Sequence, residues 1–354
     1  MKICHMTSAH PPEDIRIFVK ECVSLADFGH EVYLVEQGDT YDKKGVHIIG
    51  VGSISHKKKN RMTKGAKMVY TKAKSLNADV YHFHDPELLP YALKLMRQGK
   101  KVIYDSHEDV PAQIMDKKWI PQALRKIVSA TFKKYETHVC KRISAVVAAT
   151  PYIAKQFANR SNRVVVVNNF PKLDDIEFHD TPFIEREPIV CYAGGINELR
   201  GEKIMIEAMK KAKGKLIMAG DHEVMQLGSN VEYAGRLNRQ KVNELYGKSV
   251  VGLCILKPIE NYYYSQPIKM YEYMAAGIPF ICSDFPGWKQ VVNDSGAGIC
   301  VNPDDISSIT EAINYLLNNR NEAQSMGKKG FDYVSKSCNW ASEMQSLAKL
   351  YTEL

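Results

Sequence analysis

Short apolar runs alternate with longer amphipathic segments along the chain. In the first half, the segments at residues 15–28, 86–97 and 122–142 repeat their apolar positions with the helical period. The apolar runs between them predict strands: KICHM, EVYLV, DVYHFH, KVIYDSH, SAVVAAT and RVVVVNN. Because these strands are apolar on both faces, they indicate a parallel sheet covered by helices on both sides.

The second half repeats the same alternation. Helical patterns at 201–212, 267–276 and 304–318 separate the runs IVCYAGG, KLIMAGD, VEYAG, VVGLCIL, PFICSD and AGICVNP. Residues 168–188 are acidic, contain three prolines and lack a strong period, so they predict a linker. We therefore expect an α/β protein of two doubly wound Rossmann-like domains facing a central cleft, with ligands outside the carboxyl ends of the strands.

The expected domains are residues 1–168 and 169–337, and a terminal helix within 338–354 that could pack back on the first. A length of 354 residues suits two domains, and 45% hydrophobic with 25% charged residues excludes disorder. No apolar stretch is long enough to span a membrane, and the N-terminus does not resemble a secretory signal. The eight cysteines are spread singly, without a CxxC pair, which favours free thiols in a reducing cytoplasm.

The charge of +8 is uneven. A lysine-rich run at 56–67 and a second basic region at 117–142 lie in the first half. Either run alone is typical of a solvated surface. Together they indicate an acidic partner: nucleic acid, anionic lipid or a phosphorylated small molecule. Nucleic acid is disfavoured because no basic motif is interleaved with aromatic residues.

The segment SQPIKMYEYMAAGIP, at 265–279, carries the most specific chemistry. Pro267 suits the first turn of a helix capped by Ser265 or Gln266, and the helix ends before Gly277. A helix N-terminus that follows a strand and loop binds phosphate. Lys269 in the first turn is unfavourable unless an anion is present, which supports an anionic ligand.

This segment resembles the donor-binding signature of GT-B glycosyltransferases of the retaining family 4 type. Glu272 followed by MAAGIP matches the second half of that signature, whereas the first glutamate is replaced by Tyr264. The resemblance implies that Glu272 holds the ribose of a nucleotide-sugar donor. It also implies donor contacts from the loop and helix start, at Tyr264, Ser265, Gln266, Pro267 and Ile268.

Two further loops are similar to the same family. YAGGINELRG resembles the loop whose two basic residues bind the diphosphate. Gly194 matches the first glycine of that loop, Gly195 stands in place of the usual arginine, and Arg200 stands in place of the lysine. Lys269 would compensate for the missing cation. Arg236 in VEYAGRLN resembles the loop beside the base. The alternative for Gly194 to Arg200 is a tight turn with a surface arginine.

In the first half, VIYDSHED places His107 just past a strand, where the family has a histidine that contacts the donor sugar. Asp105 or Glu108 could instead satisfy a structural histidine. The resemblance puts His84, Asp85 and Glu87 on the acceptor side. Asp14 and Arg16 either orient an acceptor or phosphate or form a surface ion pair. We expect no metal at His82, His84 and His107, because no further ligand pattern completes a site.

The resemblance implies a metal-independent retaining glycosyltransferase in cell-surface polysaccharide or glycolipid synthesis. His107, Arg200, Lys269 and Glu272 would be its catalytic residues, and no cofactor is expected. Its partners would be a nucleotide-sugar donor and a glycan or lipid-linked acceptor. It would be cytoplasmic, with its basic first domain against the anionic inner membrane face. The alternatives are a non-hydrolysing nucleotide-sugar epimerase and a non-catalytic nucleotide-sugar-binding protein.

Overall fold

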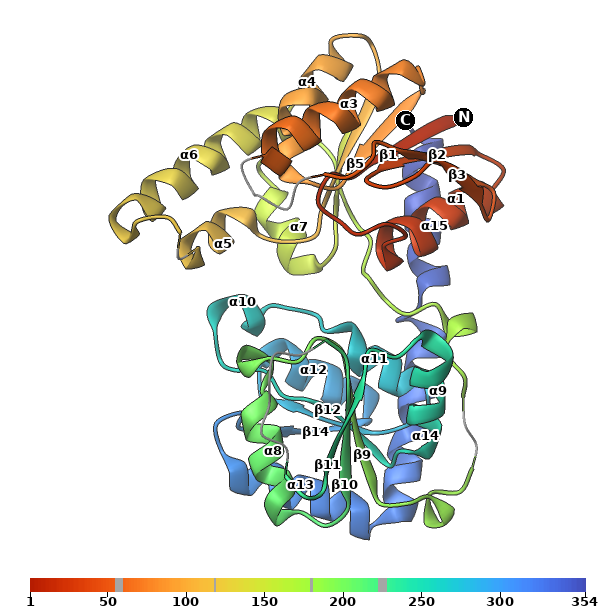
Figure 1. The fold of residues 1–354 in the computed structure, drawn as a ribbon, viewed down its shortest axis with the longest axis vertical. Coiled ribbons are helices and arrows are strands. Elements are labelled where there is room, and N and C mark those ends of the chain that lie inside the picture. The colour runs from red at the N-terminus through yellow and green to blue at the C-terminus, as the bar shows by residue number, and fades with distance from the viewer. Residues whose placement is uncertain (55–59, 118, 179–180, 222–227) are drawn as a thin grey trace. The chain divides into compact units, whose positions relative to one another are not determined.

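The protein has two compact units, each built on its own sheet (Figure 1). The first unit comprises residues 1–169 and 343–354, and the second comprises residues 170–342. The computed structural model describes residues 1–54, 60–117, 119–178, 181–221 and 228–354. Part of the predicted basic run (56–59), Lys118 of the second basic region and residues 179–180 of the predicted linker lie outside the described residues.

The first unit contains an eight-stranded sheet in the order β3-β4-β2-β1-β5-β6-β7-β8. Its strands are β1 (Lys2–Met6), β2 (Glu31–Glu36), β3 (Tyr41–Lys43), β4 (Val46–Gly50), β5 (Val80–Phe83), β6 (Lys101–Ser106), β7 (Ala145–Ala148) and β8 (Val164–Val166). Every pairing is parallel except that of β3 with β4. The predicted parallel sheet is confirmed, but β3 and β4 were not predicted. All three residues of β3 are exposed, so it carries no apolar run.

Helices connect these parallel strands. They are η1 (Ile15–Cys22), α1 (Val23–Asp27), η2 (Arg61–Gly65), α3 (Ala66–Ser75), η3 (Pro86–Leu88), α4 (Leu89–Met96), α5 (Val110–Asp116), α6 (Gln122–Cys140) and α7 (Pro151–Phe157). Three of them begin after a side chain that accepts a backbone N–H: Asp14 before η1, Asp109 before α5 and Thr150 before α7. These caps fix where each helix starts after its strand.

The second unit contains a six-stranded, wholly parallel sheet in the order β11-β10-β9-β12-β13-β14. Its strands are β9 (Ile189–Ala193), β10 (Lys215–Ala219), β11 (Val231–Gly235), β12 (Val251–Cys254), β13 (Phe280–Ser283) and β14 (Gly298–Val301). Its helices are η4 (Leu173–Asp175), η5 (Phe183–Glu185), η6 (Glu198–Arg200), α8 (Glu202–Lys211), α9 (Arg239–Lys248), α10 (Glu260–Tyr263), α11 (Ile268–Ala275), α12 (Pro286–Ser295), α13 (Ile306–Asn318) and α14 (Arg320–Lys336). The strand order reverses between β9 and β12, as in doubly wound sheets.

Most of the predicted linker belongs to the second unit, because that unit begins at Phe170. Phe170 and Phe183 are buried in its core. Helix α15 (Trp340–Thr352) carries the chain from the second unit into the first, whose last segment is residues 343–354. Among the helices of the described residues, none is both long enough and apolar enough to cross a membrane.

Candidate functional site

A two-glycine loop follows β9 at the carboxyl edge of the second sheet. Gly194 has a φ of +140°, which an L side chain rarely adopts. A Cβ atom on Gly220, at the end of β10, would lie 1.8 Å from the carbonyl oxygen of Gly194. The two loops therefore pack backbone against backbone, and glycine at 220 is what makes this approach geometrically feasible.

Both predicted cations of the second unit reach this loop. A Cβ atom on Gly195 would lie only 2.9 Å from Nη1 of Arg200, so the guanidinium occupies the space where a side chain at 195 would begin. A Cβ atom on Gly194 would lie 3.3 Å from Nζ of Lys269. Among the described residues, neither cation forms an ion pair with a carboxylate. The two charges are thus gathered over backbone rather than neutralised.

An aromatic ring beneath the loop also holds Lys269. Its Nζ lies 3.7 Å from the ring centroid of Tyr192, which is cation–π distance. The hydroxyl of Tyr192 donates to the carbonyl of Gly195 at 2.7 Å. Lys269 thus has a stabilising neighbour in the protein itself, which sequence reasoning missed because β9 supplies it from 77 residues away.

Helix α11 begins one residue later than the sequence predicts. Pro267 has the extended ψ of 119° and is the N-cap residue, and no side chain caps the helix. The predicted cap by Ser265 or Gln266 is therefore wrong. Ser265 instead donates to the carbonyl of Tyr262 and accepts from the indole of Trp288 through its own carbonyl. The first backbone N–H groups of α11 consequently lack a side-chain cap.

Glu272 lies one turn into α11 with its side chain 15% exposed. Its two oxygens accept from Arg239 at 2.7 Å and from the hydroxyl of Tyr246 at 3.1 Å. Burial works to lower the pKa of Arg239, but the charge of Glu272 and its hydrogen bond outweigh burial and raise it. Sequence reasoning missed Arg239, although Asn238 before it is a recognisable helix cap. A carboxylate has about four acceptor sites, so Glu272 can accept further hydrogen bonds.

The other predicted donor residues lie around α11 and β11. Ser265, Gln266, Pro267 and Ile268 are half-buried, and Tyr264 is 53% exposed. The side-chain oxygen of Gln266 is buried without a hydrogen-bond partner among the described residues. Arg236 is exposed, and the one ion pair that it forms with the described residues is with Asp221, at 3.8 Å. Of this set, Gln266 is the residue whose buried acceptor is left unsatisfied.

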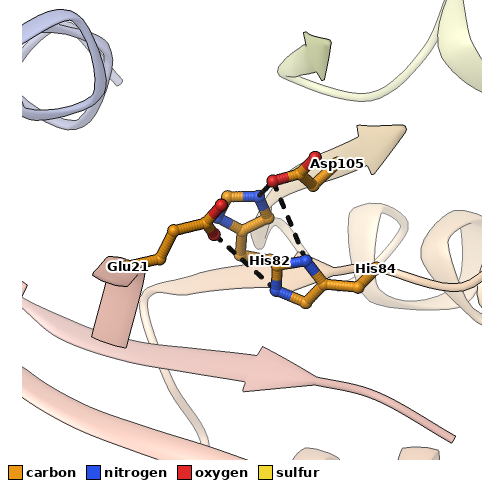
Figure 2. Close-up of side chains that lie close together, drawn as sticks. All are labelled: Glu21, His82, His84 and Asp105. Carbon is orange, nitrogen blue, oxygen red and sulfur yellow. Dashed lines mark ion pairs between the residues drawn. The ribbon is translucent and has the colours of Figure 1, made fainter. Parts of the chain in front are cut away.

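In the first unit, a cluster of ionisable side chains is buried near the carboxyl ends of β5 and β6. Figure 2 shows Glu21 of η1 with His82, His84 and Asp105, which come from β5, the residue after it, and β6. All four side chains are fully buried. His107 follows β6, lies 3.2 Å from Asp105 and is 18% exposed. The structure therefore agrees with the alternative in which Asp105 is the hydrogen-bond partner of a structural His107.

Arg16 supplies the positive charge of this cluster. Its Nη2 donates to both oxygens of Asp105, at 3.1 and 2.9 Å, and its Nε lies 3.1 Å from Glu21. Burial works to raise the pKa of Asp105, but Arg16, His107 and His84 together outweigh burial and hold that pKa well below the usual range. Burial, and then the charge of Asp105, raise the pKa of Glu21. The cluster therefore holds an Asp105–Arg16 ion pair beside Glu21, whose pKa is raised.

The same residues do not suit a metal ion, although ligand atoms of Glu21, His82, His84 and Asp105 lie within 4.8 Å of one another. The rings of His82 and His84 are stacked at an interplanar angle of 17°, so their in-plane lone pairs do not converge. Asp105 faces Nδ1 of His84, whereas Glu21 faces Nε2 on its other edge (Figure 2). Arg16 already pairs with the carboxylate of Asp105. The geometry favours a hydrogen-bonded network.

The predicted acceptor-side residues are mostly internal. Asp85 is buried and accepts from Thr7, from the backbone N–H groups of Ser8 and Ala9, and pairs with His10 at 3.1 Å. It therefore fixes the loop after β1. Asp14 caps η1, and Arg16 is buried against Asp105, so the alternative of a surface ion pair between Asp14 and Arg16 is excluded.

Glu87 is also buried and pairs with Arg61 at 3.2 Å, and His84 is enclosed behind His107. These positions favour a supporting role for His84, Asp85 and Glu87 over direct contact with an acceptor. Sequence reasoning missed His10, which is half-buried, and also Glu21 and Tyr351, whose neighbours are remote in sequence.

Comparisons with known proteins agree with this architecture. A family model described as Glycosyltransferase Family 4 matches residues 19–174, and one described as Glycosyl transferases group 1 matches residues 174–333. Sucrose-phosphate synthase from Thermosynechococcus elongatus has a similar structure, with a TM-score of 0.79, 17% identity and coverage of 99% of this chain and 98% of that one. WaaG, a glycosyltransferase involved in lipopolysaccharide biosynthesis, has a TM-score of 0.74, 14% identity and 98% coverage of both chains.

The fold and the two matched models define a GT-B glycosyltransferase. The chain belongs to the family 4 type of that class. A curated relative, the uncharacterized glycosyltransferase MJ1178 of Methanocaldococcus jannaschii, is 23% identical over 230 residues, or 63% of this chain. The match covers 62% of that relative, so this chain spans less than two thirds of its length.

Proposed function

We propose that this protein transfers a sugar from a nucleoside-diphosphate donor to a hydroxyl group, with retention of anomeric configuration. The observation that carries the proposal is the gathering of Arg200 and Lys269 over the Gly194–Gly195 loop, without carboxylate partners among the described residues. Structures of Anabaena HepE in complex with UDP-glucose support a nucleotide-sugar donor; that chain has a TM-score of 0.74 and is 12% identical, with 100% coverage of both chains.

The chemistry requires stabilisation of a departing diphosphate. Lys269 and Arg200 would neutralise the charge that develops on the leaving oxygen, and backbone N–H groups of the glycine loop would donate to it. The uncapped start of α11 adds donors and the positive end of a helix dipole. In other glycosyltransferases a divalent ion neutralises the diphosphate; here these groups would do so, and the proposed transfer is therefore metal-independent. No cofactor takes part in it.

Glu272 would bind the ribose of the donor. Its carboxylate is held by Arg239 and Tyr246, which orient it while leaving acceptor sites for the ribose hydroxyls. Gln266, with its unsatisfied oxygen, would accept from the donor as well. Tyr264 replaces the glutamate that contacts the sugar in the family signature, so the choice of sugar would rest on residues of this loop.

His107 would contact the donor sugar from the first unit. Replacing it with alanine is expected to lower kcat by about 100-fold, within the range of a positioned polar group, while donor affinity changes little. The measurement is steady-state kinetics combined with calorimetric donor binding. Equal losses in kcat and in affinity would contradict a role for His107 at the reacting sugar.

The transfer is tested with a panel of nucleotide sugars. Thermal shift identifies the donor, and mass spectrometry then follows hydrolysis and transfer to hydroxyl acceptors. Slow donor hydrolysis together with an α-linked product from an α-linked donor supports retaining transfer. Release of an isomerised nucleotide sugar without acceptor would indicate the epimerase, and tight binding without turnover would indicate a binding protein. Either outcome contradicts the proposal.

We further propose that the acceptor is glycan- or lipid-linked, and that the first unit lies against the anionic inner face of the membrane. Figure 1 shows α5 and α6 as a hairpin at the edge of this unit. Between and along these helices Trp119, Leu124 and Ile127 are 61%, 49% and 64% exposed, and Lys126 beside them is exposed. Apolar anchors flanked by cations suit an anionic lipid interface. A cytoplasmic location suits the eight free cysteines.

Vesicle co-sedimentation tests this membrane contact. Wild-type protein should bind vesicles containing anionic lipid and dissociate as salt rises, and Ile127→Asp should lose most of the binding. Leu199→Asp is the matched control, because Leu199 is 47% exposed in the second unit. Binding that ignores both lipid charge and salt would contradict the membrane proposal.

A further inference from the structure

A continuous line of side-chain contacts runs through the first unit from His107 to His82. Nε2 of His107 lies 3.3 Å from Nδ1 of His84, and Nε2 of His84 lies 3.0 Å from Nδ1 of His5. Nε2 of His5 then lies 3.2 Å from the hydroxyl of Tyr351, which lies 2.8 Å from Nδ1 of His82. Tyr351 comes from α15, at the far end of the sequence. Every member except His107 is fully buried.

The buried imidazoles of this line are neutral. Burial lowers the pKa of His82 to about 4, and burial together with neighbouring His82 lowers the pKa of His5 and of His84 well below the ordinary value. A neutral imidazole has one N–H and one lone pair. Each contact between two nitrogens can therefore hold only one proton. When His107 also carries a single ring proton, the tautomers are coupled, so either all four histidines carry the proton on Nε2 or all four carry it on Nδ1.

Asp105 distinguishes these two arrangements because it faces both ends of the line. Its Oδ1 lies 3.2 Å from Nε2 of His107, and its Oδ2 lies 3.7 Å from Nε2 of His82. Arg16 keeps this carboxylate charged. Protons on Nε2 point the N–H groups of His107 and His82 at the carboxylate. Protons on Nδ1 point two lone pairs at it and only one N–H, that of His84, whose Nδ1 lies 3.8 Å from Oδ2. The charge of Asp105 therefore favours the Nε2 arrangement.

We infer that His107, His84, His5, Tyr351 and His82 form one polarised hydrogen-bond chain, directed by Asp105, that holds His107 as the Nε2–H tautomer. Nδ1 of His107 is then a bare acceptor, for which the described residues provide no hydrogen bond. Tyr351 is a positioning residue, because its hydroxyl accepts from His5 and donates to His82. If the protein has the proposed function, Nδ1 of His107 accepts a hydrogen bond from a substrate hydroxyl.

Other charged groups face this chain and leave its direction unchanged. The ring of His10 lies 5.2 Å from that of His107 and pairs with Asp85, so its charge is matched locally. Glu21 lies 3.8 Å from Nδ1 of His5 and 3.9 Å from Nε2 of His84. Burial and the charge of Asp105 raise the pKa of Glu21, which reduces the carboxylate charge that it presents to either nitrogen.

The direct test is nuclear magnetic resonance of the full chain labelled with ¹⁵N-histidine. Long-range proton–nitrogen spectra separate protonated from bare ring nitrogens, and single His→Gln variants assign the signals. We expect Nε2–H at all four histidines near neutral pH. His47 is the internal reference, because its Nδ1 faces Asp42 at 2.6 Å. A dominant Nδ1–H form at any of the four histidines would overturn the inference.

Tyr351→Phe tests the positioning role. Without the hydroxyl, the N–H of His5 loses its acceptor, and the reversed arrangement becomes competitive. We expect His84 and His107 to change from one tautomer to a mixture of two. Tyr315→Phe is the matched control, since Tyr315 is an exposed tyrosine of the second unit that donates to Glu322. Unchanged spectra in the folded Tyr351→Phe variant would contradict the role of Tyr351.

Elemental analysis of the purified protein adds an independent check. A stoichiometric transition metal would overturn the inference, because a metal on His82 or His84 would replace the proton of the chain. None of these measurements requires turnover. A protein that shows the expected tautomers but does not transfer sugar would overturn the proposed function alone. An active enzyme with reversed tautomers would overturn only the inference.

Discussion

Lys269→Gln is the substitution that examines the proposed diphosphate site most closely. Glutamine keeps most of the length of lysine and removes its charge. Lys269 lies over Tyr192 and beside Gly194, so the substitution removes a half-buried cation without opening a core cavity. We expect weaker binding of the nucleoside diphosphate and unchanged binding of the corresponding nucleoside.

The expected size follows from the environment of Lys269. Two unit charges about 4 Å apart attract by about 4 kcal/mol at an effective dielectric constant of about 20, which sets an upper limit. A hydrogen bond to a charged group is worth about 1.5–3 kcal/mol net of solvation. At about 1.4 kcal/mol per tenfold, the diphosphate should bind roughly 10- to 150-fold more weakly. Loss of the cation–π contact with Tyr192 affects both ligands equally and cancels in the comparison.

Calorimetry with the diphosphate and with its nucleoside measures this difference. Lys203→Gln is the control, because Lys203 is exposed on α8 and pairs with Glu198. The reasoning is refuted if Lys269→Gln binds the diphosphate as wild type does. It is also refuted if nucleoside affinity falls by the same factor, since the lysine would then act on the fold rather than on phosphate.

Glu272→Ala should weaken nucleoside binding about tenfold, consistent with the loss of charged hydrogen bonds, and calorimetry with the nucleoside checks it. Gly220→Ala should abolish diphosphate binding and lower the Tm of the protein, because its Cβ would lie 1.8 Å from the carbonyl of Gly194; Gly287→Ala, whose Cβ meets nothing within 4 Å, should have little effect. Burial raises the pKa of Glu36 from 4.5 to about 7, so the folded protein retains a proton in that range that the unfolded chain has lost, and stability falls as pH rises through this window. Glu36→Gln should flatten that fall and raise the unfolding free energy at pH 8 by about 1 kcal/mol, and denaturant titrations at pH 5 and pH 8 measure it.

The sequence was sufficient for the sheets because their strands are short apolar runs at regular spacing. The structure also brings Gly194, Gly195, Arg200 and Lys269 together around one loop, whereas their role in donor binding stays a prediction. Sequence reasoning failed at β3, whose residues are all exposed, and at the start of α11, where Pro267 is a cap rather than a first-turn residue. The local sequence does not distinguish a proline at the N-cap from a proline in the first turn of a helix.

The first-unit network was beyond sequence reasoning for a different reason. Asp14, Arg16 and Asp85 were recognised as polar residues after strands, but burial and partners decide what they do. Arg16 pairs with Asp105, 89 residues away, and His82 meets Tyr351, 269 residues away. No spacing rule predicts such contacts. They arise because parallel strands and the returning α15 bring distant residues to one sheet edge.

A crystal structure of the protein with its preferred nucleoside diphosphate tests the central claim most directly. We predict the β-phosphate within hydrogen-bond distance of Lys269 and Arg200, against the backbone N–H groups of Gly194 and Gly195. A diphosphate bound elsewhere, with both cations turned away from it, would contradict the account.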